Sequence, residues 1–413
     1  MKKFLGLVLC VAGIASASMI GIDALGEEHI VGGSAAAAGR GFAGGAKTGE
    51  AEGLVVTNPA RMAFDTKVVF NLNFLLDLYS IENHNDSYFT QNISMPSFNL
   101  SFPMGAFGAI GLSLWQHYSS TIREEVSDTT NRADAKIEYK GSVYEIVPTY
   151  AVRLPVIRNV SVGASMHLVM GSMVRSLTLG PDNSEVPEDE VWATNKAKIT
   201  DYVEGAWEIE NHPAYYTGSV QYRGRQASFY FSYTTGYMLL NALDYNFRFS
   251  EVDTLIPSHI ERKIKVPPML ATGINYRLAK RHNVMMDLQW RTWDEDVENV
   301  GRSYDMRSYT KTQDDFVASL GYQREGSALY YDPFWDRVTY RAGAWYKNWY
   351  VADIYEVGGS LGAGFPLGRK GIALDLAFQG GKRFSESDGN WDEVFLGIRL
   401  GLMGIGNWGQ SRR

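Results

Sequence analysis

The stretch VFNLNFLLDL, residues 69–78, decides the fold. Apolar side chains occupy every second position from Phe70 to Leu78, and the positions between them include Asn71, Asn73 and Asp77. Successive side chains of a β-strand point to opposite faces. The spacing therefore predicts a strand with one apolar face and one mostly polar face.

The same alternation returns in about fourteen segments, most of them near the roughly 9–11 residues that a tilted strand needs to cross a bilayer. Charged residues such as Asp287, Arg341 and Arg399 stand in mid-strand on the polar face. A soluble β-sandwich would bury these charges or expose them on a second face, whereas a barrel places them in its lumen. Clear examples of the pattern are SFNLSF (97–102), VSVGASMHLVM (160–170), DYNFRFS (244–250) and VMMDLQW (284–290).

The connections between these segments favour a barrel over a sandwich. Short and long connections mostly take turns, as an up-and-down barrel requires when one rim faces the periplasm and the other faces outside. The prediction is an all-β fold: a transmembrane antiparallel barrel of about 14 strands. Two connections fit this scheme less well, because 325–336 is long for a turn and 348–353 is short for an outer loop. The short turns are 103–105, 155–159, 279–282 and 366–370, and the long polar stretches lie at about 81–93, 120–137, 178–217, 251–264, 294–313 and 383–392.

Several large aromatic residues lie near the ends of the predicted strands. Aromatic side chains form girdles at the two membrane interfaces of such barrels. We therefore expect these residues in the girdles: Tyr79, Trp115, Tyr118, Trp290, Trp293, Trp345, Trp349 and Tyr350.

The N-terminus predicts export. Two lysines precede the apolar run FLGLVLCVAGIA, and Ala15-Ser16-Ala17 fits a small-residue cleavage site, so residues 1–17 are expected to be a signal peptide. Cys10 is the only cysteine of the 413-residue chain and lies inside this leader, so we expect no disulfide in the mature protein. A net charge of -7 argues against a nucleic-acid partner, and no His/Cys cluster predicts a metal or another cofactor.

The glycine-rich stretch GRGFAGGAKTGEAEGLVVTNPARMAF, residues 39–64, superficially resembles a phosphate-binding loop. Such a loop needs glycine directly before its lysine and a strand before its first glycine, but Ala46 precedes Lys47 and no strand pattern precedes Gly39. Small residues pack closely against other backbone, and large barrels are commonly plugged. We therefore expect a hatch at 18–60, a barrel at 61–405 and a short periplasmic tail at 406–413. A disordered periplasmic linker is the alternative for the hatch.

Both ends of the chain carry a family resemblance. GGSAAAAGRGFAGGA (32–46), followed by EAEGLVVTNPARMAF (50–64), resembles the N-terminus of the long-chain fatty acid transporter family of the FadL/TodX type, whose plug ends in an Asn-Pro-Ala turn like Asn58-Pro59-Ala60. GGSLGAGFPLGRKGIALDLAFQGGKR (358–383) and the sequence from Glu393 onward are similar to distant members. The resemblance implies an outer-membrane barrel with both termini in the periplasm. It also implies passive uptake of hydrophobic molecules such as long-chain fatty acids, which pass a pocket beside the hatch and leave through a gap in the wall.

A fatty acid needs an apolar pocket with one or two cations for its carboxylate. Lumen arginines also pair commonly with lumen acids such as Asp287 or Asp375, so each cation has a purely structural alternative. The candidate carboxylate partners are Arg40 and Lys47 in the hatch and Arg291, Arg341 and Arg399 in the lumen, and the candidate contacts to the alkyl chain are Phe42 and Leu54.

Three residues predict an irregular wall. Pro148 cannot donate a ladder hydrogen bond, and Gly163 and Gly171 in the following strand mark a bulge or kink. The two interpretations are a lateral opening and a harmless bulge at the rim.

Two other functions remain open beside transport, and we expect the protein not to be an enzyme. His117-Tyr118-Ser119 places His and Ser two apart on a strand face, as in some outer-membrane lipid hydrolases, with Glu124, Glu125 or Asp128 as a partner for the imidazole. A barrel of this kind could also be a docking platform for secretion or surface assembly, with the acidic loop 181–210 as its contact. Transporter and platform differ in whether the purified barrel holds a hydrophobic molecule.

Overall fold

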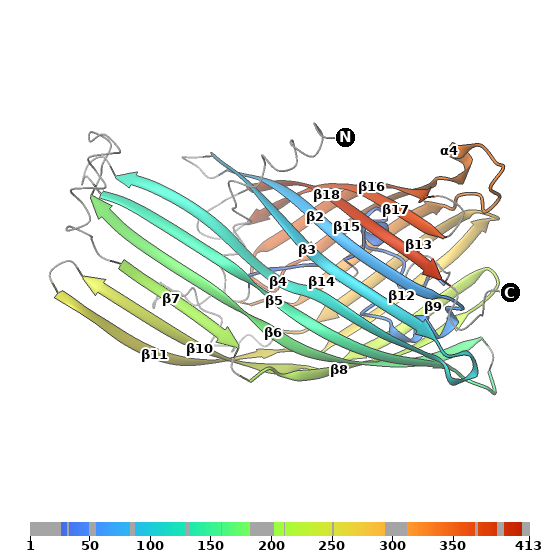
Figure 1. Ribbon diagram of the computed structural model, residues 1–413, viewed down its shortest axis with the longest axis horizontal. Coiled ribbons are helices and arrows are strands. Elements are labelled where there is room, and N and C mark those ends of the chain that lie inside the picture. Colours follow the sequence, from blue (N-terminus) through green and yellow to red (C-terminus); the bar gives the residue numbers. More distant parts are fainter. Residues whose placement is uncertain are drawn as a thin grey trace.

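The computed structural model describes residues 26–30, 33–48, 55–82, 87–128, 133–157, 159–181, 202–209, 211–249, 252–293, 312–367, 371–385 and 392–406. They form a closed antiparallel β-barrel that surrounds the described residues ahead of its first strand, 26–30, 33–48 and 55–64 (Figure 1). Its wall consists of β2 (Val68–Glu82), β3 (Ser87–Pro103), β4 (Ala109–Asp128), β5 (Ala133–Arg153), β6 (Val160–Pro181), β7 (Tyr202–Ile209), β8 (Ala214–Arg223), β9 (Ala227–Thr234), β10 (Tyr237–Phe249), β11 (Val252–Val266), β12 (Met269–Ala279), β13 (His282–Arg291), β14 (Asp315–Arg324), β15 (Thr339–Asn348), β16 (Ile354–Leu367), β17 (Ile372–Ser385) and β18 (Asp392–Gly406).

The barrel closes where the last strand meets the first. β18 pairs with β2 over the whole length of both strands, from Gly406 opposite Val68 to Asp392 opposite Glu82. Three wall strands are each built from two consecutive elements, β7 with β8, β9 with β10 and β11 with β12. β7 and β8 both pair with β6, and the other two pairs continue one another because β10 pairs with β7 and β11 while β9 pairs with β8 and β12. Counted in this way the wall has 14 strands, which confirms the predicted fold class.

The predicted inward and outward faces are confirmed on the deciding stretch. Asn71, Asn73 and Asp77 are buried on the lumen side, whereas Phe74 is 46% exposed on the outer side. The same division holds on β13, where Met285 and Asp287 are buried and Trp290 is 50% exposed. A polar interior and an apolar outer surface are what a lipid-embedded barrel requires.

The expected aromatic girdle is wrong for seven of its eight residues. Only Trp290 is exposed on the outer wall; Tyr79, Trp115, Tyr118, Trp293, Trp345, Trp349 and Tyr350 are buried. Closeness to a strand end does not fix the face, and Tyr79, for example, shares the inward face with Asp77. The aromatic residues that do face outward include Tyr216, Phe229, Phe231, Tyr233 and Phe378.

The long polar stretches were also expected to be loops, and much of their length is strand. Residues 120–128, 133–137, 202–209 and 252–264 continue β4, β5, β7 and β11. Together with β6 and β10 these strands project well beyond the other wall strands (Figure 1). Strands outside a membrane pair through their backbones without an apolar face, so the test of alternation does not detect them.

The remaining elements are short. They are β1 (Glu27–Glu28), α2 (Ala35–Ala38), η2 (Pro59–Phe64), η3 (Gly105–Phe107) and α4 (Phe334–Arg337). Among the described residues, no helix is long and apolar enough to cross a membrane. β1, α2 and η2 lie inside the barrel, where their described residues are buried.

Candidate functional site

The described part of the N-terminal segment fills the lumen with two units. We call residues 26–30 the latch and residues 33–48 the hatch core. The hatch core contains α2, whose start is capped by Ser34: its hydroxyl accepts a hydrogen bond from the Ala37 amide at 3.1 Å. All four alanines of α2 are buried. The domain boundaries around these units stay predictions.

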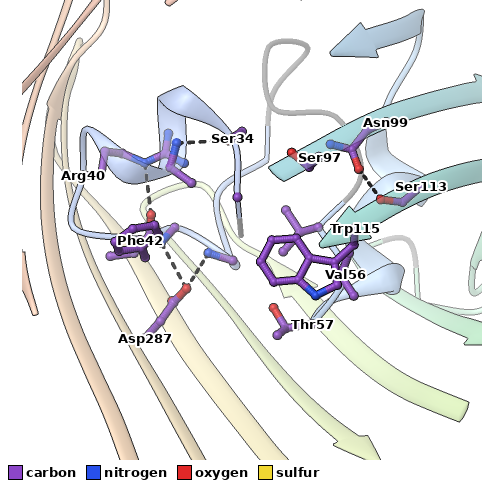
Figure 2. A pocket seen from close by; sticks show the side chains of 16 residues that line it. Ser34, Arg40, Phe42, Val56, Thr57, Ser97, Asn99, Ser113, Trp115 and Asp287 are labelled. Atoms are coloured by element: carbon purple, nitrogen blue, oxygen red, sulfur yellow. Dashed lines mark hydrogen bonds between the residues drawn. The ribbon is translucent and has the colours of Figure 1, made fainter. Parts of the chain in front are cut away.

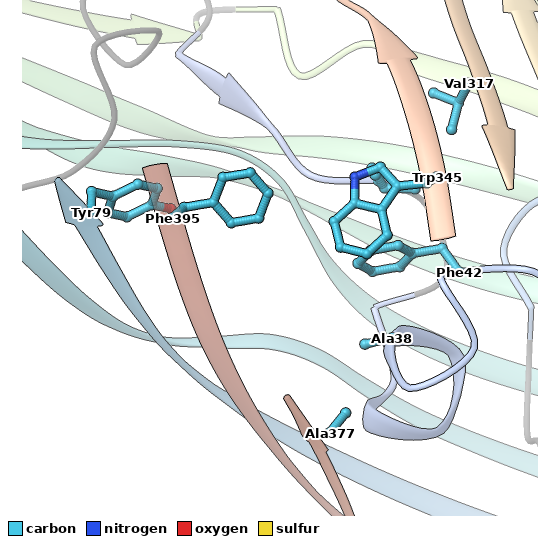
Figure 3. Packing of buried hydrophobic residues seen from close by; sticks show 8 residues of the cluster. Ala38, Phe42, Tyr79, Val317, Trp345, Ala377 and Phe395 are labelled. Atoms are coloured by element: carbon cyan, nitrogen blue, oxygen red, sulfur yellow. The ribbon is translucent and has the colours of Figure 1, made fainter. Parts of the chain in front are cut away.

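Glycine allows the hatch core to lie directly against the wall backbone. Gly41 has φ +63°, and a Cβ there would stand 2.6 Å from the Ala344 nitrogen. Gly343 on β15 faces it, and a Cβ at this position would lie 2.1 Å from the Arg40 carbonyl carbon. Next to this contact, Phe42 meets Trp345 edge to face with 5.2 Å between the ring centroids (Figure 3). Small residues therefore allow the hatch core to lie against the wall backbone here.

Backbone amides of the hatch core bind one wall carboxylate. Gly44 and Gly45 donate to Asp287 Oδ2 at 3.1 and 2.7 Å, beneath Arg40 and Phe42 (Figure 2). Asp287 thus accepts from backbone, and the Arg40 guanidinium adds a Coulombic attraction to its carboxylate. Arg40 itself donates to Gln323 Oε1 at 2.8 Å.

The Asn-Pro-Ala turn docks the end of the hatch on β8. Asn58 donates to the Gly45 carbonyl at 2.9 Å and to Gln221 at 2.7 Å. The Ala60 amide donates to Ser219 Oγ at 2.8 Å. The turn therefore links the hatch core to β8 just before the first wall strand begins.

The latch binds the wall as an added strand. Glu27 pairs with Ser119 and Glu28 with Tyr118 on β4, and the His29 amide continues the ladder to the His117 carbonyl at 2.9 Å. Beside the latch, β3 is no longer paired with β4. The β3–β4 ladder runs only from Pro103 opposite Ala109 to Ser97 opposite Trp115. The latch thus covers part of the β4 edge where a seam opens in the wall.

Buried charges clamp the latch in place. Glu28 forms ion pairs with Arg291 and with Lys347, whose ammonium lies 3.4 Å from Glu28 Oε2 and donates to the Glu28 carbonyl at 2.9 Å. Glu27 Oε1 accepts from Arg383 at 2.6 Å. The cations come from β13, β15 and β17, so the latch ties three wall strands to β4.

A hydrogen-bonded line continues from the latch across the neighbouring strands β4, β5, β6 and β8. His117 lies 3.1 Å from Glu28 Oε1 and 2.5 Å from Glu145 Oε1. Glu145 also meets His167 at 2.9 Å, and His167 contacts Thr217 at 2.9 Å. His117 sits at a bulge between Gln116 and Tyr118 that turns its ring into the lumen.

This line does not have the geometry of the hydrolase that the His-Tyr-Ser motif suggested. His117 is held by two carboxylates, whereas Ser119 Oγ is bonded to His29 Nε2 at 2.9 Å. The structure therefore brings the two motif residues to different partners. The side chains of Glu124, Glu125 and Asp128 lie outside the described part of the structure.

Burial and charge act in opposite directions on the latch carboxyl groups. Burial alone would raise the pKa of Glu28, but Arg291 and Lys347 outweigh it and hold the pKa well below the ordinary value. Burial likewise opposes the effects of Arg383 and His29 on Glu27, whose pKa is also lowered. Burial lowers the pKa of His29 to about 4, with Glu27 acting against this shift. The latch therefore carries two carboxylates and a neutral imidazole at neutral pH.

The lumen around the latch and hatch core is densely filled. Four cavities there have volumes of about 30, 20, 30 and 10 Å³. A water molecule needs roughly 10–15 Å³ of such space, so each cavity has room for only one or a few waters. A long apolar molecule enters this part of the lumen only if the latch or the hatch core moves.

The predicted ligand residues lie in this filled region and bind protein groups. Arg291 pairs with Asp315 at 3.0 Å as well as with Glu28, and Arg341 pairs with Asp375 at 2.6 Å. Lys47 lies 3.3 Å from Glu325. Arg399 donates to the Gly33 carbonyl at 3.1 Å and lies 5.2 Å from the centre of the Phe42 ring. Leu54 lies outside the described residues.

The residues predicted to mark an irregular wall lie on β5 and β6, whereas the seam beside the latch lies between β3 and β4. Pro148 falls in a gap of the β5–β6 ladder between Ile146–Leu168 and Thr149–Ser165. Gly163 makes room for the hatch turn, because a Cβ there would lie 2.4 Å from the Ala60 nitrogen, and Gly171 has φ +145°. Sequence reasoning missed the seam between β3 and β4 and the clamp residues Lys347 and Arg383. The adjacent acids Glu27 and Glu28 in the segment before the barrel were the available signal.

Comparison with known proteins places the chain in a family. A family model described as BamG matches residues 42–413, most of the chain. The chain belongs to the BamG family. No curated protein sequence matches this BamG-family barrel.

Solved structures share its fold. A Pseudomonas aeruginosa FadL homologue matches with 14% identity and a TM-score of 0.64, covering 92% of this chain and 99% of that one. The monoaromatic hydrocarbon channel CymD matches with 17% identity and a TM-score of 0.58 over 93% and 100%. The Pseudomonas putida toluene transporter TodX matches with 13% identity and a TM-score of 0.59 over 93% and 100%. The BamG-family barrel therefore has the FadL/TodX type of fold, which confirms the resemblance read from the sequence at the level of architecture.

Proposed function

We propose that this barrel passes hydrophobic small molecules across the outer membrane by passive diffusion, with the latch as its gate. The observation that carries the proposal is the position of the latch on the β4 edge, at the level where β3 and β4 separate. A latch that moves away frees space in the lumen and uncovers a lateral route at the same time. The shared fold with channels named for toluene and monoaromatic hydrocarbons supports this direction.

Fatty acids are the finer form of the proposal. The lumen offers cations next to aromatic rings, such as Arg399 beside Phe42 and Arg383 beside Phe395 at 4.6 Å. A carboxylate with an alkyl chain needs this combination of groups.

The test is equilibrium binding of labelled oleate and labelled dodecane to the detergent-purified barrel. Saturable binding of either compound, strengthened when residues 18–30 are deleted, is the expected result. A folded barrel that binds neither compound, with or without these residues, would contradict transport of hydrophobic molecules.

A docking platform is the second candidate, and the connection between β14 and β15 favours it. This connection, long for a turn, is held by Arg324 on Asp336 at 3.2 Å and by Phe334 stacked on Phe365 with 6.5 Å between ring centroids. It nevertheless presents Tyr331 at 81% and Trp335 at 66% exposure. Rigid, exposed aromatic residues are typical anchors of protein interfaces. Of the loop 181–210 that the sequence suggested for this role, only the backbone of Pro181 and of residues 202–209 is described.

The platform predicts that Tyr331→Ser together with Trp335→Ser abolishes co-purification of a partner, while Phe378→Ser on the lipid-facing wall does not. Equal co-purification with both variants would exclude this surface as the docking site.

A further inference from the structure

Three arginines lie together at the end of the barrel that carries the short turns, opposite the projecting strands (Figure 1). The Cζ atoms of Arg153, at the end of β5, and of Arg223, at the end of β8, each lie 5.4 Å from the centre of the Phe64 ring. Arg277, near the end of β12, interacts electrostatically with Arg223. Because Phe64 belongs to η2 and is buried inside the barrel, the arginines surround the mouth of the lumen.

A cavity of about 500 Å³ opens at this mouth. It is lined by Arg153, by Ala63 and Asp65 at the end of η2, and by residues of the β3–β4 connection between 103 and 108. Arg153 Nε donates to the Ala63 carbonyl at 2.8 Å, which fixes the guanidinium at the edge of the cavity. The volume lies in the range of roughly 300–1,000 Å³ that binding pockets occupy. The mouth therefore has room for several side chains of a ligand.

The mouth carries more positive than negative charge. Asp65 interacts with Arg223 and is the one acid among the described residues that line the cavity. Like charges held close together repel, and an anion that joins them relieves the repulsion. Three arginines around one carboxylate therefore indicate an anionic partner. Three further acids at this end are paired with different cations: Glu325 with Lys47 at 3.3 Å, Asp332 with Arg281 at 3.9 Å and Asp336 with Arg324 at 3.2 Å.

The alternation of the wall strands points these arginines away from the lipid. Tyr222, next to Arg223, and Tyr276, next to Arg277, are 36% and 40% exposed on the outer wall. Successive side chains of a strand point to opposite faces, so a lipid headgroup at the outer wall meets the tyrosines and not the guanidiniums. On the lumen side, η2 is buried and docked on β8, so a partner reaches the arginines from the water outside the mouth.

We propose that Arg153, Arg223 and Arg277 bind an acidic segment of a partner protein at this mouth, which we expect to face the periplasm. One small anion fills little of the cavity, whereas an extended peptide with several carboxylates meets several guanidiniums, and each such pair can be bidentate. The site goes beyond the proposed transport and does not depend on it. It also uses residues other than Tyr331 and Trp335.

The first experiment measures binding of a fluorescein-labelled hexaglutamate peptide to the full-length barrel in an uncharged detergent, by fluorescence anisotropy. The unaltered barrel should bind the peptide saturably, and Arg153→Gln combined with Arg223→Gln should weaken binding about tenfold or more. Arg281→Gln combined with Arg324→Gln is the matched control. It removes the same charge from the same rim, so affinity should change by no more than about twofold. No binding to the unaltered barrel, or equal weakening in both double variants, would overturn the proposal.

The second experiment looks for a gain of binding, which misfolding does not produce. Asp65→Asn removes the acid that competes for the arginines, so hexaglutamate should bind about threefold to tenfold tighter. Unchanged or weaker binding would count against the site.

A lipid headgroup is tested in the same preparations by mass spectrometry of co-purified phospholipids. Loss of anionic phospholipid from the Arg153→Gln and Arg223→Gln double variant, with hexaglutamate still bound, would overturn the peptide site and assign the arginines to lipid. Binding of labelled oleate and dodecane should be the same in this variant as in the unaltered barrel, which separates the outcome from that of the transport test.

Discussion

The latch and the hatch core fill the same lumen through different chemistry. The latch is held by charge: two adjacent glutamates meet Arg291, Lys347 and Arg383. The hatch core is held by close approach of backbones, as at Gly41 and Gly343, and by the amides that bind Asp287. Charge pairs respond to protonation and to competing ions, whereas backbone packing responds to volume. The difference indicates that the latch is the movable unit and the hatch core the fixed one.

The largest expected effect comes from removing one partner of the latch clamp. Arg291→Gln leaves the buried carboxylates of Glu28 and Asp315 without their shared cation. Breaking a buried pair in this way costs about 3–5 kcal/mol, so the latch should release while the hatch core stays docked. Hydrogen exchange should show faster exchange at residues 27–30 and unchanged protection at 37–43. Equal loss of protection in the latch and the hatch core would contradict the claim that only the latch is movable.

Acid should release the latch but not the hatch core. The pKa of His29 is lowered from 6.5 to about 4 in the docked latch, so the docked state binds fewer protons than the released state. Docking is therefore fully stable above about pH 6.5 and weakens as the pH falls toward 4, by up to about 3 kcal/mol. Glu27 and Glu28, with pKa values below their usual 4.5, add a further loss only at still lower pH.

The measurement is hydrogen exchange of the backbone amides of residues 27–30 as a function of pH, corrected for intrinsic exchange rates. His29→Gln is the control. The variant should lack the transition between pH 6.5 and 4 and keep only the steeper loss below it. An unchanged pH profile in the variant would assign the transition to another group.

Added side-chain volume, unlike acid, should destabilise the docking of the hatch core. Gly343→Ala places a Cβ 2.1 Å from the Arg40 carbonyl carbon, and an overpacked contact of this kind costs about 1–3 kcal/mol. Gly218→Ala on the outer wall is the control, because nothing lies within 4 Å of its Cβ position. Thermal unfolding should show a lower Tm for the first variant and no change for the second. A lower Tm in both would point to a general loss of strand stability.

The smallest expected effect concerns the acceptor of the hatch amides. Asp287→Ala leaves the Gly44 and Gly45 amides without an acceptor and should cost about 1–3 kcal/mol of hatch docking. Asp287→Asn keeps an acceptor oxygen and should recover most of this loss. Exchange rates at residues 44–45 report the difference, and identical rates in the two variants would contradict the role of the carboxylate oxygen.

The sequence predicted the wall well and the interior only in outline. Alternation along 69–78 fixes which side chains face the lumen, because a strand has a period of two residues. It does not fix which lumen residues meet, since Glu28 and Lys347 lie 319 residues apart and are joined only by closure of the barrel. The seam between β3 and β4 was equally hidden, because separation of two strands depends on their tilt and on the latch that replaces one of them. The prediction of the aromatic girdle was wrong for a related reason. Trp345 and Trp349 lie near strand ends along the chain, but their side chains face inward onto Phe42 and Lys347.

The most direct test of the latch as the gate is a reversible lock. Glu27→Cys and Ser119→Cys, in a Cys10→Ser background, place two cysteines directly opposite each other in the β1–β4 ladder, at a separation that suits a disulfide. The readout is quenching of tryptophan fluorescence by a brominated long-chain fatty acid. The exposed Trp290 and Trp335 are quenched with or without the lock, whereas the buried Trp345 and Trp349 are quenched only by a ligand inside the lumen. The account predicts saturable quenching of these tryptophans in the reduced protein and its loss when the disulfide is formed. Equal quenching in the oxidised and reduced forms would show that ligands reach the lumen without moving the latch, and would contradict the account.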